Sequence, residues 1–406
     1  MYSCRQMKNI FNKSKWTILI TVWSTAIICL HMQYVSSKDQ KRSMDEPETT
    51  KPSVNIKYYD VLISSYMRSG STLTGIILGW RADTFYLYEP FWKVSQWAYW
   101  HGNDTVCRSD YLDCRKVEPG KAVQDKSFPN NKYKDNPVSL VMAMKILRKI
   151  YSCQFDGLKR TVFDRRITVG LGGPSWSQMR TCMKSKGEFE SCLQSYIPQN
   201  CKNATHRVAK VLRLSIDLLE DILRARKNLK VIHLFRDPRA IINSRIERKW
   251  YPPHKEERII ENAKTLCNKM LYDFQAGQKL SKLYPDRFMF VYYEDLSENP
   301  SGKSKELFKY FGMDLEEHKY RHVKKLSVFN SATKRSERQN NTAFWWRKSL
   351  KWDIVQKMEP LCKDVFTELG YKIFTNVQEY QNLSTSSITI PNKYLILKVK
   401  ENASQD

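Results

Sequence analysis

The 406-residue sequence is poor in acidic residues, with 42 Asp and Glu against 68 Lys and Arg, which gives a net charge of +26. So large an excess predicts an anionic partner, which could be nucleic acid, a membrane surface or an acidic polymer. The 22 Tyr and 11 Trp fit stacking on bases or on sugars equally well. Charge and composition therefore predict the kind of ligand and leave its identity open.

The sequence also lacks the usual metal motifs and any internal repeat. Its ten cysteines contain no C-x-x-C pair, which argues against a zinc ribbon. His318 and His322 have the i, i+4 spacing of a zinc pair on a helix, but no Glu follows the first His, and Lys319 and Arg321 add positive charge. A metalloprotease is therefore disfavoured, and we expect no metal.

One long apolar stretch lies near the N-terminus, at residues 16–35. Its length of about 20 residues is enough to cross a bilayer. The basic residues before it are Arg5, Lys8, Lys13 and Lys15, with no acidic residue among them. The positive-inside rule predicts a cytosolic tail at 1–15 and a signal-anchor at 16–35. The alternative is a cleaved signal peptide, which is disfavoured because no clear cleavage site follows.

The remainder of the chain would then lie in the lumen. Residues 36–56 are polar and contain Pro47 and Pro52, which is typical of a flexible stem. Residues 57–375 carry the pattern of an α/β domain, whereas 376–406 show no readable role.

Eight cysteines follow the apolar stretch, and an even number in an oxidising compartment predicts disulfides. Eight cysteines allow 105 connectivities, so the pairing stays open, with Cys107–Cys114 the easiest local loop. Glycosylation sequons in this part of the chain begin at Asn103, Asn203, Asn340, Asn382 and Asn402.

Strand-like and helix-like segments alternate from Tyr58 onward, which predicts a mostly parallel sheet with helices on both faces. The expected strands are 59–65, 84–88, 207–213, 229–235 and 287–292. The expected helices are 72–80, 138–152, 215–227, 238–249, 256–283, 302–311 and 353–369. Residues 92–136 and 168–205 are predicted to be irregular excursions, the first of them lying over the active site.

A Ser/Gly-rich turn, Arg68-Ser69-Gly70-Ser71-Thr72, lies between the first strand and the first helix. Backbone N–H groups and the positive end of the helix dipole would meet there, as in a phosphate cradle. The turn is not a Walker A loop, because the first Gly and the Lys are missing, which argues against ATP or GTP. Taken alone, such a cluster is more often an ordinary turn.

A second polar segment, Arg236-Asp237-Pro238-Arg239 with Ser244 and Arg245, follows the strand at 229–235. Asp237 and Pro238 predict a helix start, as N-cap and first-turn residue. Ser244 lies about two turns into that helix. The same residues can start a helix and bind an anion. Each of the two segments could hold one phosphate, so together they predict a ligand with two phosphate groups.

These two segments resemble the R-S-G-S-[ST] and R-D-P-R-x-x-x-x-S-R motifs of the Golgi carbohydrate sulfotransferases, specifically the galactose, N-acetylgalactosamine and N-acetylglucosamine 6-O-sulfotransferase group. The resemblance covers roughly residues 57–375 and implies the P-loop-like sulfotransferase fold. Further matches, in order, are Tyr88-Glu89-Pro90, Lys210-Val211-Leu212-Arg213, Tyr293-Glu294-Asp295-Leu296 with Asn299-Pro300, Trp346-Arg347 and Leu369-Gly370-Tyr371.

The resemblance implies a donor site for 3′-phosphoadenosine 5′-phosphosulfate (PAPS). The 5′-phosphosulfate would be held by Arg68, Ser69, Gly70, Ser71 and Thr72. Arg236 and Ser244 would hold the 3′-phosphate. Arg68 would also stabilise the leaving phosphate, and Glu89 would be the general base. The simpler alternatives are a solvated Arg68 and an ion-paired Glu89.

Other polar and aromatic residues in or near these motifs are interpreted as follows. Arg239 and Arg245 are weaker candidates for the anion site. Lys210 and Arg213 would line the acceptor groove or merely end a strand. The segment 345–347 would cover the nucleotide, stack on a sugar or pack in the core. Glu294-Asp295 is expected to order its loop, and His233 to be a core histidine.

The resemblance therefore implies a single-pass type II Golgi enzyme that transfers sulfate from PAPS to a hydroxyl, the 6-hydroxyl by analogy, of Gal, GalNAc or GlcNAc in a glycan. The positive charge favours a chondroitin or keratan type of acceptor over nucleic acid. The alternative is a glycosaminoglycan-binding membrane protein without catalytic activity.

Overall fold

The computed structural model describes residues 59–91, 98–102, 105–108, 114–116, 140–158, 163, 168–185, 187–251, 255–323 and 343–388. The predicted cytosolic tail, signal-anchor and stem lie outside these residues. Over the described ranges, no helix is both long and apolar enough to span a bilayer.

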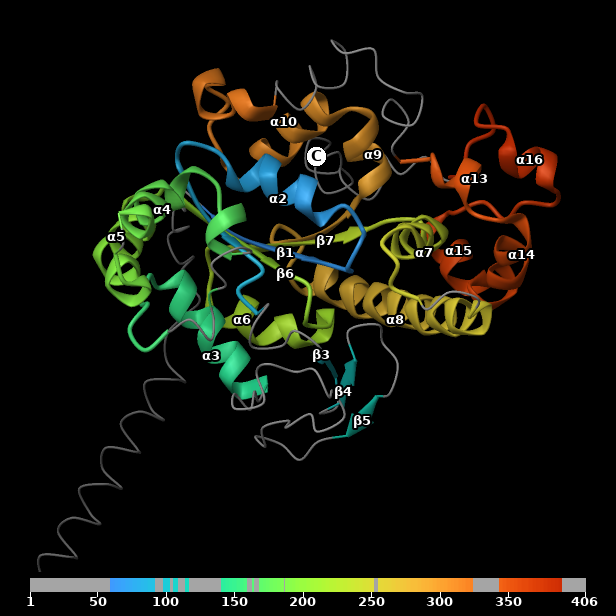
Figure 1. Ribbon diagram of the computed structural model, residues 1–406, viewed down its shortest axis with the longest axis horizontal. Helices are drawn as coiled ribbons and strands as arrows, with labels where there is room; N and C mark the ends of the chain where they lie inside the picture. The colour runs from blue at the N-terminus through green and yellow to red at the C-terminus, as the bar shows by residue number, and fades with distance from the viewer. Residues whose placement is uncertain are drawn as a thin grey trace, which may run out of the picture. The chain divides into compact units, whose positions relative to one another are not determined.

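The centre of the domain is a five-stranded parallel sheet, which confirms the predicted class (Figure 1). Its strands lie in the order β2-β6-β1-β7-β8. Their bounds are Asp60–Ser65 for β1, Thr84–Tyr88 for β2, His206–Val211 for β6, Leu229–Phe235 for β7 and Phe288–Tyr292 for β8. Because all five strands are parallel, their carboxyl ends lie at one edge of the sheet, where ligands usually bind.

Alternate residues of each strand point to opposite faces of the sheet and enter two separate cores. Val61 and Ile63 of β1 pack in one core with Phe308, whereas Leu62 packs in the other with Met270. The first core is covered by α2 (Ser71–Gly79) and α10 (Pro300–Tyr310). The second is covered by α3 (Leu140–Tyr151), α6 (Glu220–Ala225) and α8 (Glu256–Leu283) (Figure 1). Helices therefore cover both faces, as predicted.

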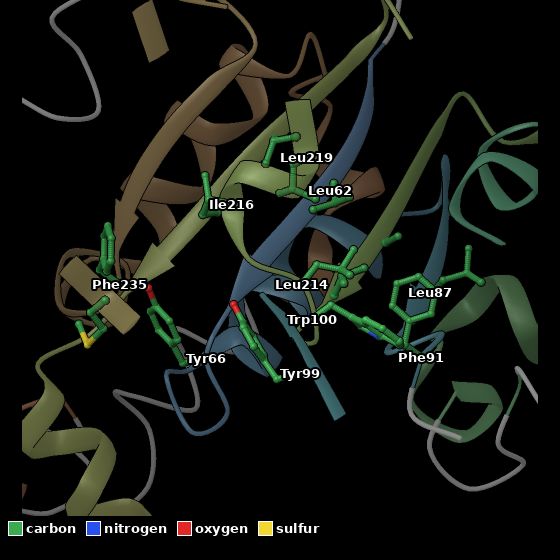
Figure 2. Packing of buried hydrophobic residues seen from close by; sticks show 14 of the residues in the cluster. Leu62, Tyr66, Leu87, Phe91, Tyr99, Trp100, Leu214, Ile216, Leu219 and Phe235 are labelled. Carbon is green, nitrogen blue, oxygen red and sulfur yellow. The ribbon is translucent and has the colours of Figure 1, made fainter. Parts of the chain in front are cut away.

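The two excursions are more regular than the sequence indicates. Residues 92–136 include an antiparallel sheet of β3 (Ala98–His101), β4 (Thr105–Arg108) and β5 (Arg115–Lys116). Trp100 anchors β3 by donating its N–H to the Arg213 carbonyl at 2.8 Å. Its indole packs near Phe91 and Leu214 (Figure 2). Strands of two to four residues are too short to show an alternating sequence pattern. Contacts with distant residues supply their stability.

The expected irregularity of 168–205 is wrong for most of that range. It contains a short 3₁₀ turn, η2 (Pro174–Trp176), and the helices α4 (Ser177–Lys184) and α5 (Phe189–Asn203). A disulfide between Cys182 and Cys192 joins these two helices. Pro198 lies inside α5, and a proline in a sequence argues against a helix there. In the folded domain, burial of one face of α5 stabilises the helix.

Other helices begin or end differently from the prediction. The expected helix over 215–227 starts as a 3₁₀ turn, η3 (Ile216–Leu219), before α6. The helix over 353–369 is divided into α14 (Trp352–Leu361) and α15 (Lys363–Leu369), just after Pro360, and ends as expected at Gly370. The remaining helices are α7 (Pro238–Glu247), α9 (Tyr293–Glu298), η4 (Glu317–Lys319), α13 (Trp346–Ser349) and α16 (Val377–Gln381).

Disulfides pair all eight cysteines that were expected to face an oxidising compartment. The local loop Cys107–Cys114 is among them. The other pairs are Cys153–Cys201, Cys182–Cys192 and Cys267–Cys362. The last pair joins α8 to the residue between α14 and α15, so it fastens the C-terminal helices to the central domain.

Candidate active site

A cavity of about 520 Å³ lies where β1, β2, β6 and β7 end. Seven of the eight residues predicted for the site line it, so the structure brings together segments that are far apart in sequence. These seven are Arg68, Gly70, Ser71, Thr72, Glu89, Arg236 and Ser244. Ser69 is different, because it is fully buried and its hydroxyl donates to the Tyr66 carbonyl at 2.7 Å.

The turn after β1 has the geometry of an anion cradle. Gly70 is the N-cap of α2 with φ 92°, in the left-handed region. A Cβ at this position would lie 2.0 Å from Cδ2 of Tyr293, so only glycine fits. The first N–H groups of a helix have no acceptor within it, so those of α2 are directed at the cavity edge together with the positive end of the dipole.

Arg68 connects the two predicted phosphate segments. Its Nε donates to Ser244 Oγ at 3.1 Å, and its carbonyl accepts from Nη1 of Arg236 at 3.0 Å. Arg68 has a φ of 76°, which is strained for a residue with a side chain. Strained backbone of this kind concentrates at functional sites, where surrounding contacts hold it in place.

Positive charge in the cavity is not balanced locally. Burial lowers the pKa of Arg68, and the nearby positive charges of Arg248 and Arg236 lower it further. The guanidinium of Arg236 stacks on the Tyr293 ring at 4.5 Å. Its Nε is buried and has no hydrogen-bond partner among the described residues. A bound anion would both relieve this repulsion and accept the available N–H groups.

Glu89 projects a carboxylate into the same cavity from the end of β2. Lys210 holds it, because Nζ of Lys210 donates to Oε1 at 2.8 Å and stacks over the Tyr88 ring at 3.6 Å. The other oxygen, Oε2, is buried and has no hydrogen-bond partner among the described residues. Glu89, like Arg68, has a positive φ, here 44°. The arrangement leaves one carboxylate oxygen available to accept a proton.

The two weaker arginine candidates are buried in the scaffold. Arg239 is fully buried and pairs with Asp237 at 2.8 Å and with Glu359 at 2.5 Å. Arg245 is also fully buried and donates to Asn262 Oδ1 at 2.7 Å. Neither lines the cavity, so the structure assigns both to holding α7 in position.

The buried acid Glu294 and the buried His233 lie behind the site. Glu294 accepts the Asp237 N–H at 2.9 Å, and burial raises its pKa to about 8. It therefore orders the start of α7, as expected. Burial lowers the pKa of His233 to about 3, so this residue is a neutral core histidine that contacts Ser64 and Tyr66.

The possible zinc pair is not assembled. His322 Nε2 contacts the Ile77 carbonyl at 3.1 Å, and the exposed His318 lies 3.3 Å from Glu316. In the part of the chain that the structure describes, no group of three or more His, Cys, Asp or Glu side chains could hold a metal.

Sequence reasoning missed several residues of the cavity wall. Arg248 and Trp250 line it from the end of α7, and Tyr293 lines it from the start of α9. Arg248 lies one turn after Ser244 on α7, so helical spacing is a signal that could have identified it. Trp250 follows the helix and has no comparable signal.

The segment 345–347 serves both the cavity and the core. Trp345 and Trp346 line the cavity, although Trp346 is only 2% exposed and packs on Tyr380. Arg347 donates to four carbonyls between Glu379 and Thr385, at 2.6 to 3.0 Å. The start of the C-terminal extension, which had no readable role, therefore packs against the helix that carries the tryptophans.

Several known proteins are similar to this chain. The chain is 27% identical over 367 residues to carbohydrate sulfotransferase 1 of Danio rerio, with 81% of each chain covered. It is 25% identical to carbohydrate sulfotransferase 4 of Mus musculus, covering 80% of this chain and 84% of that protein. Sulfotransferase STF9 of Mycobacterium avium, a solved structure, aligns with 11% identity and a TM-score of 0.38, covering 84% of this chain and 82% of that one. Residues 59–370 match the sulfotransferase domain family, and the chain belongs to this family.

Proposed function

We propose that this sulfotransferase transfers a sulfuryl group from PAPS to a hydroxyl of Gal, GalNAc or GlcNAc in a glycan, at the 6-position. The observation that carries the proposal is the convergence of Arg68, Arg236, Ser244 and Glu89 on one cavity. The cavity thus combines fixed positive charge, a helix N-terminus and a carboxylate with one oxygen that has no hydrogen-bond partner within the described ranges.

The donor supplies an activated sulfuryl group whose leaving group is a 5′-phosphate. In the proposed reaction the acceptor oxygen forms a bond to sulfur as the bond from sulfur to the 5′-phosphate oxygen breaks. Glu89 Oε2 accepts the hydroxyl proton as general base. Arg68 and the N–H groups of Ser71 and Thr72 stabilise the charge that develops on the leaving phosphate. The products are a sulfate ester and 3′-phosphoadenosine 5′-phosphate (PAP).

Arg236 and Ser244 are proposed to bind the 3′-phosphate. Two features support this role: the Nε of Arg236 has no hydrogen-bond partner among the described residues, and Ser244 Oγ lines the cavity in contact with Arg68 Nε. An Arg fork and a hydroxyl are suited to a dianionic phosphate. Ser69 would shape the turn without contacting the anion directly, because its hydroxyl and its backbone N–H both donate to the Tyr66 carbonyl, at 2.7 and 3.3 Å.

The names of the similar proteins support a carbohydrate acceptor. The net charge of +26 favours a polyanionic glycan of the chondroitin or keratan type. We further propose a single-pass type II Golgi topology, with a tail at 1–15, an anchor at 16–35, a stem at 36–56 and a catalytic domain at 57–375. The support for this topology is the basic flank and apolar stretch in the sequence.

A second candidate function is glycosaminoglycan binding without catalysis, which the positive charge alone would explain. It does not account for the strained Arg68 and Glu89 backbones at the cavity. The two functions differ in whether PAPS is consumed.

The test is a secreted form lacking residues 1–35, incubated with radiolabelled PAPS, EDTA and chondroitin, keratan, heparan and mucin-type glycans. We expect label on one glycan class, at the 6-hydroxyl, and none with Arg68→Ala. Tight PAP binding without label would indicate an acceptor absent from the panel. Failure to bind PAP and failure to label any glycan would reject the proposed function.

A further inference from the structure

We propose that Trp250 is a binding platform for a sugar ring of the acceptor. The proposal rests on the proposed function and adds a subsite to it. Trp250 follows α7 and lines the same cavity as Glu89 and Arg68. The residue is 40% exposed, so a ligand in the cavity can reach it.

Two backbone hydrogen bonds define the conformation of the main chain at Trp250. The N–H of Trp250 donates to the Arg245 carbonyl at 3.1 Å, and the N–H of Lys249 donates to the Ile246 carbonyl at 2.8 Å. These two bonds form a complete Schellman motif, with Lys249 in the left-handed position at φ 56°. Because a non-glycine residue at this position is strained, the surrounding contacts must hold it, and the backbone that carries Trp250 is preorganised.

The ring of Trp250 is only partly covered by the protein. The Arg245 guanidinium lies 5.4 Å from its centroid, which is a cation–π contact between the two residues whose backbones close the motif. Arg245 is fully buried and anchored on Asn262, so it forms a rigid support. The exposed part of Trp250 borders the cavity. Such a surface can pack against the C–H face of a pyranose ring.

Contacts connect Trp250 to the acceptor half of the cavity. Beneath the ring, Arg245 donates to the Met67 carbonyl at 3.3 Å. The Met67 sulfur in turn contacts Nη1 of Arg213, just past β6, at 3.2 Å. β6 is the neighbour of β2, which ends at Glu89. Trp250 is therefore linked to the side of the sheet that carries the proposed base.

The aromatic surface on the other half fits the nucleotide better. Tyr293 follows β8 and stacks on Arg236, which follows β7. Both strands lie on the opposite side of β1 from β6 and β2. The nucleotide carrying a 3′-phosphate at Arg236 would meet Tyr293, so the proposal assigns this ring to the donor.

The test compares Trp250→Ala, Trp250→Phe and Trp250→Leu. Leu keeps an apolar side chain at this position, and a thermal melt of each variant would reveal a folding defect. We expect Ala and Leu to raise the acceptor KM about tenfold or more, because a lost stacking contact is typically worth that much. Phe should retain most of the affinity. The affinity for PAP, measured by calorimetry, should stay within about twofold.

A fall in PAP affinity with an unchanged acceptor KM would overturn the proposal and assign the ring to the nucleotide. No change in either quantity would leave Trp250 as a helix cap only. Binding of chondroitin and keratan oligosaccharides is also measured in a Glu89→Gln background, which needs no turnover. If that binding depends on Trp250 while the wild type transfers no sulfate, the subsite stands and the proposed function fails. Absence of glycan binding in this background rejects the subsite.

Discussion

Arg68 Nε donates a hydrogen bond to Ser244 Oγ at 3.1 Å, across 176 residues of sequence. This single contact joins the turn after β1 to the helix after β7. It also brings the residues proposed to bind the two phosphate groups of the donor into one cavity. The distance between these sites is therefore determined by the sheet, since β1 and β7 are neighbours in it.

Arg68→Ala is expected to lower kcat/KM about 10²–10³-fold, because the variant removes a fixed charge from the leaving phosphate. Arg68→Lys should recover only part of the loss, since an ammonium cannot reproduce the fork. Steady-state sulfate transfer measures both. The matched control is Arg224→Ala, which removes an exposed arginine on α6. An equal loss in the control would indicate a general effect of charge.

Gly70→Ala should raise the KM for PAPS at least about tenfold, because the new Cβ would displace the Tyr293 ring and disturb the cradle. Gly157→Ala is a close control, since Gly157 has a φ of +71° but no atom within 4 Å of the added Cβ. Both variants carry backbone strain, so only the clash differs. If they lose donor affinity equally, the cradle geometry is not the cause.

Arg236→Met and Arg239→Met should separate binding from stability. Arg239 is buried between Asp237 and Glu359, so its removal leaves unpaired buried carboxylates and should cost about 3–5 kcal/mol of stability. Arg236→Met should leave stability nearly unchanged and weaken PAP binding. Urea unfolding and calorimetry measure the two effects. The reverse pattern would contradict the assignment of these residues.

Glu294 should make stability fall as pH rises. Burial raises its pKa in the folded protein to about 8, so the folded state keeps this proton where the unfolded state, with a pKa near 4.5, releases it. The stabilising contribution is therefore complete below pH 4.5 and is lost as pH rises through 8, at up to about 1.4 kcal/mol per pH unit. Glu294→Gln should flatten this slope in urea unfolding between pH 5 and 9. An unchanged slope in the variant would assign the pH dependence to other groups.

Local signals in the sequence predict much of the fold. The apolar strands, the N-cap Asp237 with Pro238, and the terminal Gly370 all act through neighbours within about one helical turn or along one strand. The order of strands and polar turns also indicates that Arg68, Glu89 and Arg236 follow strand ends. Because parallel strands end at one edge, their convergence could be expected before the structure. The tail, anchor and stem remain predictions.

The sequence by itself determined which chemical groups are available and which secondary structures carry them. Only the tertiary structure decided what each group does. Arg236 and Arg239 lie three positions apart, yet only Arg236 lines the cavity. Arg239 is buried, because it pairs with Glu359 where α7 packs against the C-terminal helices. The disulfide pairs, the helices within 168–205 and the exposed Trp250 depend in the same way on contacts between distant segments. Burial and pairing are properties of the packed chain, so no local pattern encodes them.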